Sequence, residues 1–365
     1  MSKYWNKRTK NITPYVPGEQ PKDRKFIKLN TNENPYPPSP KVIEAIQKTA
    51  NGDLRLYPDP TCTAFREAVA ARYGYKKEQV FAGNGSDEIL GFAFGAFFES
   101  RQAGNLQNAD ILFPDISYSF YPVYANLWDN PFRTIPLSDD FSIKCDDYKN
   151  PSGGVVIPNP NAPTGMPLPL ADVLSLAEYL ELQNRVLVLD EAYAAYGTES
   201  AVPHIGDHPN LLTVHTLSKS ASLAGLRLGF AIGSEELIEG LFRIHDSFNS
   251  YTMDRLALAG GIAAVNDPGY YDGINNKVKA TRERTVKELA GLGFNQVPSA
   301  ANFIFVKAPN INGGDLYTAL RERGILVRHF NKPRISDYIR VSIGTDEDMD
   351  AFIKACMEIV KRQER

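Results

Sequence analysis

The sequence predicts an α/β fold with a mostly parallel sheet in a large domain, followed by a smaller α+β domain. From about residue 61 to residue 233, helical stretches alternate with short apolar runs, as in successive βα units. The runs are apolar almost throughout and several are rich in β-branched residues, which is typical of strands buried on both faces. A chain of 365 residues is long for one core, which favours two domains.

The elements of the first two thirds follow in a definite order. The stretch NENPYPPSP at 32–40 cannot form a regular helix, because proline lacks an N–H donor and restricts the residue before it. We expect an extended arm there and a helix near 40–49. A further helix is expected at 170–182. The strand candidates are residues 80–82, 111–113, 154–157, 185–189, 211–215 and 228–232.

Beyond residue 233 the strand signal fades. Helices are expected at 235–248, 254–265, 277–292, 314–323 and from about 346 onward, with strands at 302–306, 325–328 and 338–343. We therefore predict an N-terminal arm at 1–28, a large domain at 29–265 and a small α+β domain at 266–365.

Composition excludes several classes of function. Apolar residues make up 43% and charged residues 23% of the chain, and the net charge of −3 offers no basic field for nucleic acid or an anionic membrane. The three cysteines form no C-x-x-C pair, which argues against disulfides and a cysteine-rich metal site. The five histidines form no metal constellation. With a polar start and no apolar run of roughly twenty residues, the sequence predicts a cytoplasmic protein that binds no metal.

Polar or small residues follow nearly every predicted strand. Ligands in open α/β sheets bind beyond the carboxyl ends of the strands, so we expect these segments to converge. They are GNGSDE at 83–88, Tyr118 shortly after Pro114, NPNAPTG at 159–165, DEAY at 190–193 and TLSK at 216–219.

Each feature alone has an ordinary explanation. Gly83-x-Gly85 is usually just a turn, and Glu88 stands where a dinucleotide fingerprint has its third glycine, so a nicotinamide site is not expected. Asp190 alone would be a helix cap, and Lys219 alone a surface lysine.

Together the features fit pyridoxal 5′-phosphate. This cofactor needs a lysine amine for its Schiff base, a carboxylate for its ring nitrogen, a hydrogen bond to its phenolic oxygen and donors for its phosphate. Lys219, Asp190 and Tyr193 offer the first three. Ser86, Ser218 and Arg227 offer the phosphate donors, since Ser86 lies near the start of an expected helix.

Ordered motifs carry a resemblance to a known family. NAPTG at 161–165, LDEAY at 189–193 and the segment from TLSK at 216–219 to RLG at 227–229 resemble the fold-type I, class-II pyridoxal-phosphate aminotransferases. More narrowly, the chain resembles the histidinol-phosphate aminotransferases over essentially its whole length. The closer matches are TPYVPGEQP at 13–21, LNTNENP at 29–35, LYP at 56–58, GNGSDE at 83–88 and Val327-Arg328.

This resemblance implies a fold, a reaction and a set of roles. The large domain would contain a seven-stranded sheet. The reaction would be the transamination of L-histidinol phosphate with 2-oxoglutarate to imidazole acetol phosphate and glutamate, in histidine biosynthesis. Lys219 would hold the cofactor and move the proton, Asp190 would pair with the ring nitrogen, and Tyr193 with the phenolic oxygen.

The resemblance also implies binding residues. The cofactor would contact Gly85, Ser86, Asp87, Tyr118, Asn161, Thr216, Ser218 and Arg227, besides the three catalytic residues. Tyr57 would reach the cofactor phosphate of a neighbouring subunit, which implies a homodimer. Substrate would contact Tyr15, Asn34, Arg328 and Arg340, with Arg340 on a carboxylate and Arg328 on a phosphate. Ala162 departs from the family pattern, which has Asn at this position, so either Asn161 or Tyr193 alone would contact the phenolic oxygen.

Other functions remain open at this point. An aromatic amino-acid aminotransferase or a threonine-phosphate decarboxylase would share the cofactor and the lysine. A non-catalytic binding protein could keep the fold, because fold alone does not give function. A nicotinamide-dependent oxidoreductase is the remaining α/β alternative.

Overall fold

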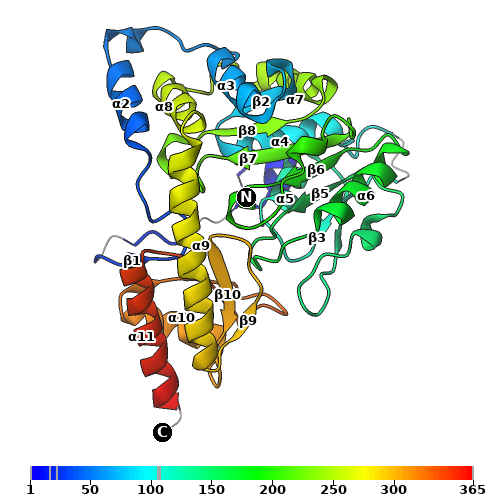
Figure 1. Cartoon of the computed structure of the whole chain (residues 1–365). Helices are drawn as coiled ribbons and strands as arrows, with labels where there is room; N and C mark the ends of the chain where they lie inside the picture. Colours follow the sequence, from blue (N-terminus) through cyan, green and yellow to red (C-terminus); the bar gives the residue numbers. More distant parts are fainter. Residues whose placement is uncertain (1, 16–17, 22–23, 105–107, 364–365) are drawn as a thin grey trace.

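A seven-stranded sheet forms the centre of the larger part of the molecule (Figure 1). The computed structural model describes residues 2–15, 18–21, 24–104 and 108–363. The strand order is β2-β8-β7-β6-β5-β3-β4, and only β8 runs antiparallel to its neighbours. The predicted mostly parallel seven-stranded sheet is confirmed. The strands are β2 (Val80–Gly83), β3 (Ile111–Pro114), β4 (Phe132–Ile135), β5 (Gly154–Pro158), β6 (Leu187–Asp190), β7 (Leu211–Thr216) and β8 (Gly229–Ile232).

Helices cover both faces of this sheet, which explains the unbroken apolar runs. In β5, Val155 and Ile157 pack into the core on one face, while Val156 packs into the core on the other. The first face is covered by α3 (Thr63–Tyr73), α6 (Leu170–Glu181) and α8 (Arg255–Val265). The second is covered by α4 (Gly85–Phe97), α5 (Tyr121–Trp128) and α7 (Glu235–Phe248).

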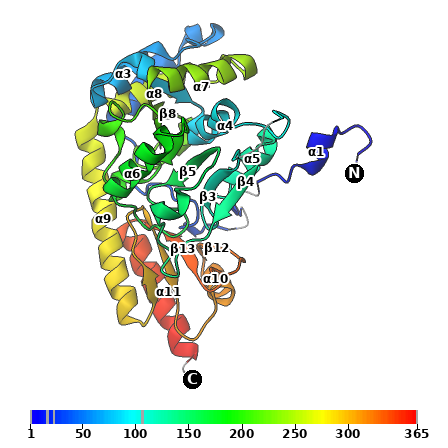
Figure 2. The same cartoon turned by 90° about the vertical axis from the view of Figure 1, so that its right-hand side faces the viewer.

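Side-chain caps fix where several helices begin. Ser39 accepts a hydrogen bond from the Lys41 N–H and precedes a proline, so that α2 (Pro40–Thr49) has the predicted bounds. Ser234 caps α7, and Asp254 caps α8 by accepting from two backbone N–H groups. The short helix α1 (Lys7–Asn11) lies near the N-terminus, beyond α5 and β4 (Figure 2). Single 3-10 turns occupy Gly52–Arg55, Lys77–Gln79, Cys145–Tyr148, Ala194–Tyr196, Val202–His204 and Ala224–Leu226.

The C-terminal part is built on a smaller antiparallel sheet. Its order is β12-β13-β10-β9, formed by β9 (Asn295–Val297), β10 (Phe303–Lys307), β12 (Arg328–His329) and β13 (Ile339–Ser342). It shares a core with α9 (Pro268–Gly291), α10 (Gly313–Glu322) and α11 (Asp346–Gln363). Strand β1 (Ile27–Lys28) pairs in parallel with β11 (Ile325–Leu326), which ties the arm to this part.

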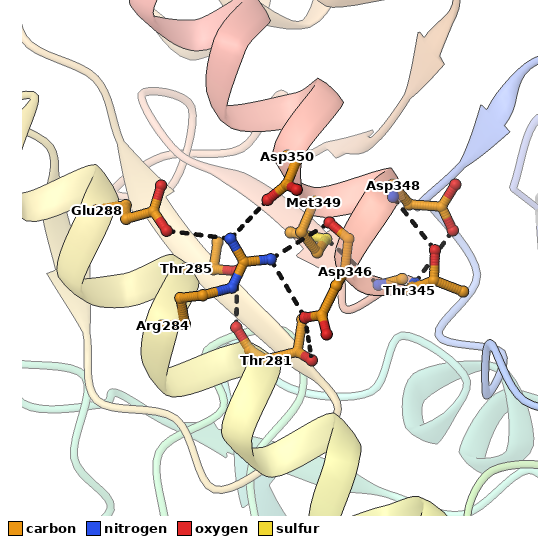
Figure 3. A network of polar contacts seen from close by, with 10 residues as sticks. Thr281, Arg284, Thr285, Glu288, Thr345, Asp346, Asp348, Met349 and Asp350 are labelled. Atoms are coloured by element: carbon orange, nitrogen blue, oxygen red, sulfur yellow. Dashed lines mark hydrogen bonds and ion pairs between the residues drawn. The ribbon is translucent and has the colours of Figure 1, made fainter.

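The longest helix, α9, runs alongside both parts of the molecule (Figures 1 and 2). It begins at Pro268, about nine residues before the start that the charge pattern predicts. Within it, Arg284 binds Glu288 one turn further on and crosses to Asp346 and Asp350 at the start of α11, the last at 2.6 Å (Figure 3). Thr281 also donates to Asp346. The first turn of α11 is therefore held by side chains of α9.

Two further observations concern the described residues. No helix among them is long and apolar enough to cross a membrane. No group of three or more metal-ligating side chains lies together in this part of the chain. Cys62, Cys145 and Cys356 are buried and unpaired.

Candidate active site

A cavity of about 180 Å³ lies where the carboxyl ends of the large sheet face the small sheet. Strands β5, β6 and β7 deliver residues from one side, and β12 and β13 from the other. Twelve of the predicted site residues line it: Tyr15, Ser86, Asp87, Tyr118, Asp190, Tyr193, Thr216, Ser218, Lys219, Arg227, Arg328 and Arg340. The predicted convergence of strand ends is confirmed.

Asp190 is the last residue of β6 and is only 6% exposed. Its carboxylate accepts hydrogen bonds from the Tyr121 hydroxyl, at 2.9 Å, and from the Ala192 N–H, at 3.1 Å. Both partners are neutral, and burial raises the pKa of Asp190 to about 6. A buried carboxylate at a cavity wall with only neutral partners is suited to a cationic ligand.

Lys219 and Tyr193 lie near each other in the lining of the same cavity. The Lys219 Nζ donates to the carbonyl of Thr31 at 3.0 Å and lies 5.8 Å from the centre of the Tyr193 ring. The Tyr193 ring packs edge-on against Phe303, and its hydroxyl accepts a hydrogen bond from Asn32 at 2.9 Å. Both the amine and the phenol are therefore held at the cavity surface by the chain segment around residue 31.

The N-terminus of α4 and Arg227 form a cradle. Arg227 donates to Ser218 Oγ at 3.2 Å and to Asp87 Oδ2 at 3.1 Å, and Asp87 also accepts from the Tyr118 hydroxyl at 2.6 Å. Gly85 has a φ of +75°, and a Cβ there would lie 2.6 Å from Arg227 Nη2. A side chain at Gly85 would thus displace the guanidinium. Free N–H groups of a helix start beside an arginine form a site for a phosphate.

Two arginines line the side of the cavity that the small sheet forms. Arg340 donates from Nη2 to the carbonyl of Asn30 at 2.9 Å, while its Nε has no hydrogen-bond partner among the described residues. Burial lowers its pKa. Its guanidinium lies over Phe303 and Phe330, at 5.3 Å and 5.6 Å. Within the part of the chain that the structure describes, neither Arg340 nor Arg328 forms an ion pair with a carboxylate, so both charges are available to an anionic ligand.

Tyr15 stacks on Phe120 with ring centres 4.1 Å apart and lines the cavity. This arrangement offers a flat apolar surface to a ring-shaped ligand.

Some predicted residues do not reach the cavity. Asn34 binds the Tyr196 hydroxyl and the Asn275 side chain. Asn161 is fully buried and donates to the Ile116 carbonyl and to Thr164, whereas Ala162 lines the cavity in its place. Gly85 acts only through the space that it leaves for Arg227. The geometry therefore gives no support to direct ligand contacts from Asn34 or Asn161.

Tyr57 is 78% exposed and lies outside the cavity. Its ring packs against Tyr251, and its backbone carbonyl accepts a hydrogen bond from Arg255 at 3.0 Å. The sequence alone did not indicate that Arg255 holds the backbone at Tyr57. Nor did it indicate Tyr121 and Asn32, whose importance depends on three-dimensional contacts with Asp190 and Tyr193.

The family follows from comparison with known proteins. The family described as aminotransferase class I and II matches residues 24–355. The chain belongs to this family of aminotransferases. It is 52% identical to the histidinol-phosphate aminotransferase of Clostridium botulinum (strain 657 / Type Ba4) over 362 residues, which cover 99% of this chain and 100% of the relative. The histidinol-phosphate aminotransferase of Clostridium acetobutylicum is also 52% identical, over 360 residues and the same shares of both chains.

A solved structure agrees with these relatives. The histidinol-phosphate aminotransferase of Sinorhizobium meliloti in complex with pyridoxal 5′-phosphate superposes with a TM-score of 0.86 at 25% identity, covering 99% of both chains. The resemblance that the sequence motifs indicate is thereby confirmed, as is the fold-type I architecture.

This aminotransferase depends on pyridoxal phosphate, as its family does, and its residues fit that cofactor. Asp190 offers a buried carboxylate for a protonated ring nitrogen, and Lys219 an amine that donates to a backbone carbonyl oxygen. The gap at Gly85 leaves Arg227 and the start of α4 open to a phosphate.

Proposed function

We propose that this aminotransferase transfers the amino group of L-histidinol phosphate to 2-oxoglutarate, giving imidazole acetol phosphate and glutamate in histidine biosynthesis. The observation that supports this proposal most strongly is that Lys219, Arg328 and Arg340 line one cavity, with neither arginine paired to a carboxylate of the described residues. One substrate is a phosphate monoester and the other a dicarboxylate. Arginine binds both kinds of anion through two parallel hydrogen bonds.

Lys219 is assigned the covalent and proton-transfer roles. Pyridoxal phosphate, when bound, supplies a carbonyl carbon for amines and a ring that withdraws electrons from the α-carbon of the substrate. The Lys219 Nζ, held by the Thr31 carbonyl, would be the amine that holds this cofactor. The same Nζ would be placed to take the α-proton of the substrate and return it, as a general base and then a general acid.

Asp190 and Tyr193 tune the cofactor. The Asp190 carboxylate, once opposite a ring N–H⁺, is stabilised in its ionised form and keeps the ring protonated. Tyr121 holds this carboxylate in place. The Tyr193 hydroxyl is assigned the hydrogen bond to the phenolic oxygen, because Ala162 offers no donor at the family's Asn position and Asn161 points elsewhere.

The remaining roles concern the ligands' anionic ends. Ser86, Asp87, Thr216, Ser218 and Arg227 would surround the cofactor phosphate, with Tyr118 beside the ring. Arg340 would hold the carboxylate of glutamate, Arg328 the phosphate of histidinol phosphate, and Tyr15 the imidazole. Both half-reactions would then use one site in turn, which predicts ping-pong kinetics.

The assembly and location are part of the proposal. We propose a cytoplasmic homodimer in which Tyr57 reaches the partner's cofactor phosphate. The 78% exposure of the Tyr57 side chain and its pairing with Tyr251 support this crossing, because a large aromatic pair at a surface is typical of an interface. A monomer by light scattering at micromolar concentration would contradict the dimer.

We also propose the division into arm (1–28), large domain (29–265) and small domain (266–365). The core that the small sheet shares with α9, α10 and α11 is distinct from the core between the large sheet and α4, α5 and α7, which supports this division. Limited proteolysis that cuts first near residues 28 and 266 would agree with this division, whereas first cuts inside either sheet would contradict it.

One comparison of rates tests the substrate. The expected order of kcat/KM is L-histidinol phosphate far above L-phenylalanine and L-threonine phosphate, with 2-oxoglutarate as acceptor. Equal or faster amino transfer from phenylalanine would favour an aromatic aminotransferase. Release of carbon dioxide from threonine phosphate would favour the decarboxylase.

A further inference from the structure

The chain segment 29–32 is held from several sides where it crosses between the two sheets. Its backbone carbonyls accept hydrogen bonds from the side chains of Arg340, Lys219 and Asn302, at residues 30, 31 and 32 respectively. The distances are 2.9, 3.0 and 2.9 Å. Leu29 exchanges further backbone hydrogen bonds with Leu326 and Ser342. This segment therefore has a fixed position against both the catalytic lysine and the strand that carries Arg340.

Asn32 is the residue of this segment that turns toward Tyr193. It is 1% exposed and has a φ of +56°, a left-handed conformation that asparagine and glycine tolerate best. Its N–H donates to Ser342 Oγ at 2.8 Å, its Oδ1 lies 2.9 Å from the same hydroxyl, and its Nδ2 lies 2.9 Å from the Tyr193 hydroxyl.

These three contacts indicate which group donates in each hydrogen bond that joins Ser342, Asn32 and Tyr193. The Ser342 oxygen accepts the backbone N–H of Asn32, so the single hydroxyl hydrogen of Ser342 is left to donate to Asn32 Oδ1. The reverse orientation of the Asn32 amide would leave this hydrogen without an acceptor among the described residues, so the oxygen of the amide faces Ser342. The NH₂ group must then face Tyr193, and the Tyr193 oxygen must accept.

The hydroxyl hydrogen of Tyr193 is therefore not used in the contact with Asn32. A phenol has one hydrogen to donate, and Asn32 Nδ2 cannot accept it. The hydrogen is therefore left for a partner in the cavity that Tyr193 lines.

We propose that Asn32 is a positioning residue that makes Tyr193 a donor to the phenolic oxygen of the cofactor. This inference rests on the role of Tyr193 in the proposed function. It gives the LNTNENP segment a part in tuning the cofactor. The same network reaches β13, where Ser342 and Arg340 are two residues apart and so point to the same side of the strand.

The test is a pH titration of the absorption band of the bound cofactor, without substrate. A hydroxyl that donates to the phenolic oxygen stabilises its negative charge, which lowers the pH at which the neighbouring lysine nitrogen loses its proton. Asn32→Gly removes the side chain but suits the positive φ and keeps the backbone N–H bond to Ser342. We expect this variant to raise the titration midpoint by about half a pH unit, which corresponds to part of the free energy of one neutral hydrogen bond.

Two further variants make the result specific. Tyr193→Phe should raise the midpoint at least as far, and Asn32→Gly should add nothing in that background, because its effect passes through the hydroxyl. Asn34→Gly is the matched control, since the same side chain is removed two residues away, where it contacts Tyr196 and Asn275. Its midpoint should equal that of the wild type, with Tm measured for all variants.

The outcomes separate this inference from the proposed function. If Tyr193→Phe shifts the midpoint and Asn32→Gly does not, the role of Asn32 is wrong and the proposed function stands. An equal shift by Asn32→Gly with and without the Tyr193 hydroxyl would also overturn it. If neither variant shifts the midpoint, the role of Tyr193 in the proposed function is wrong as well.

Discussion

Arg328 and Arg340 lie directly opposite each other on the antiparallel strands β12 and β13, and both line the active-site cavity. Like charges at facing positions of a sheet repel one another, and the charge of Arg328 contributes to the lowered pKa of Arg340. The chain thus keeps an unfavourable pair at the place where two anionic substrates must bind in turn. Binding of either anion relieves the repulsion.

Arg328→Gln should lower kcat/KM for L-histidinol phosphate about 100-fold, because a charge-assisted bond to a phosphate contributes about 2–3 kcal/mol. L-histidinol, which lacks the phosphate, is the control substrate and should change little. Because the substitution removes a repulsion, the Tm of the cofactor-free protein should not fall. Equal losses with both substrates would show that Arg328 does not read the phosphate.

Arg340→Lys tests the carboxylate site. A lysine keeps the charge but loses the paired N–H groups of the guanidinium, so we expect KM for 2-oxoglutarate to rise about tenfold or more. The single-turnover rate with L-histidinol phosphate should fall much less. A larger effect on histidinol phosphate than on 2-oxoglutarate would exchange the roles assigned to the two arginines.

Asp190→Asn should separate stability from catalysis. The folded-state pKa of about 6 is above the ordinary aspartate value of 3.8, so the folded state holds a proton that the unfolded state loses between these pH values. Stability from this group is complete below about pH 4 and is lost as pH rises through 6. Without cofactor, the Asn variant should therefore match the wild type near pH 4 and be more stable above pH 7, by about 3 kcal/mol.

Burial raises the pKa of the neighbouring Glu191 to about 7, and the Asp190 charge adds to that rise, so the difference between the two proteins includes the response of Glu191. Saturation with pyridoxal phosphate should cancel the advantage of the Asn variant, and its turnover should be strongly reduced. A stability difference that does not change between pH 4 and pH 8 would show that Asp190 does not titrate in this way.

Arg284→Ala tests how the last helix is held. Arg284 is about one third exposed and contacts Glu288, Asp346 and Asp350 (Figure 3). We expect a loss of about 1 kcal/mol, the upper range for partly exposed ion pairs, and a smaller loss in high salt. Arg243→Ala, which breaks an exposed i,i+4 pair to Glu239 on α7, is the control and should change stability by less than about 0.5 kcal/mol. An equal loss in both variants would argue against a special role for the α9–α11 contact.

Patterns along the chain sufficed for much of the fold. Both faces of the large sheet are buried, so β5, β6 and β7 read as continuous apolar runs. Strand β4 lies at the edge with half of its residues exposed, and its FRTI sequence carries no such signal. The first turns of α9 are rich in glycine and tyrosine, and only packing extends the helix back to Pro268.

Local sequence patterns predict only some of the residues of the site. The lysine, the aspartate and the arginines follow strand ends, which converge by topology alone. Asn32 contacts Tyr193 and Asn34 does not, and Asn32 is the one of the two with a left-handed backbone conformation. The contact of Tyr121 with Asp190 joins residues that are 69 positions apart in the sequence. Sequence spacing cannot distinguish such partners, because their geometry is set by how the two sheets face each other.

The most direct measurement is the absorption spectrum of the purified, cofactor-loaded protein before and after addition of L-histidinol phosphate. We predict that the band of the lysine-bound cofactor is replaced by that of the amine form, and that 2-oxoglutarate restores it. The Lys219→Ala variant is the control and should not complete this cycle. A bound-cofactor band that histidinol phosphate leaves unchanged, but that another amino donor converts, would contradict the proposed substrate.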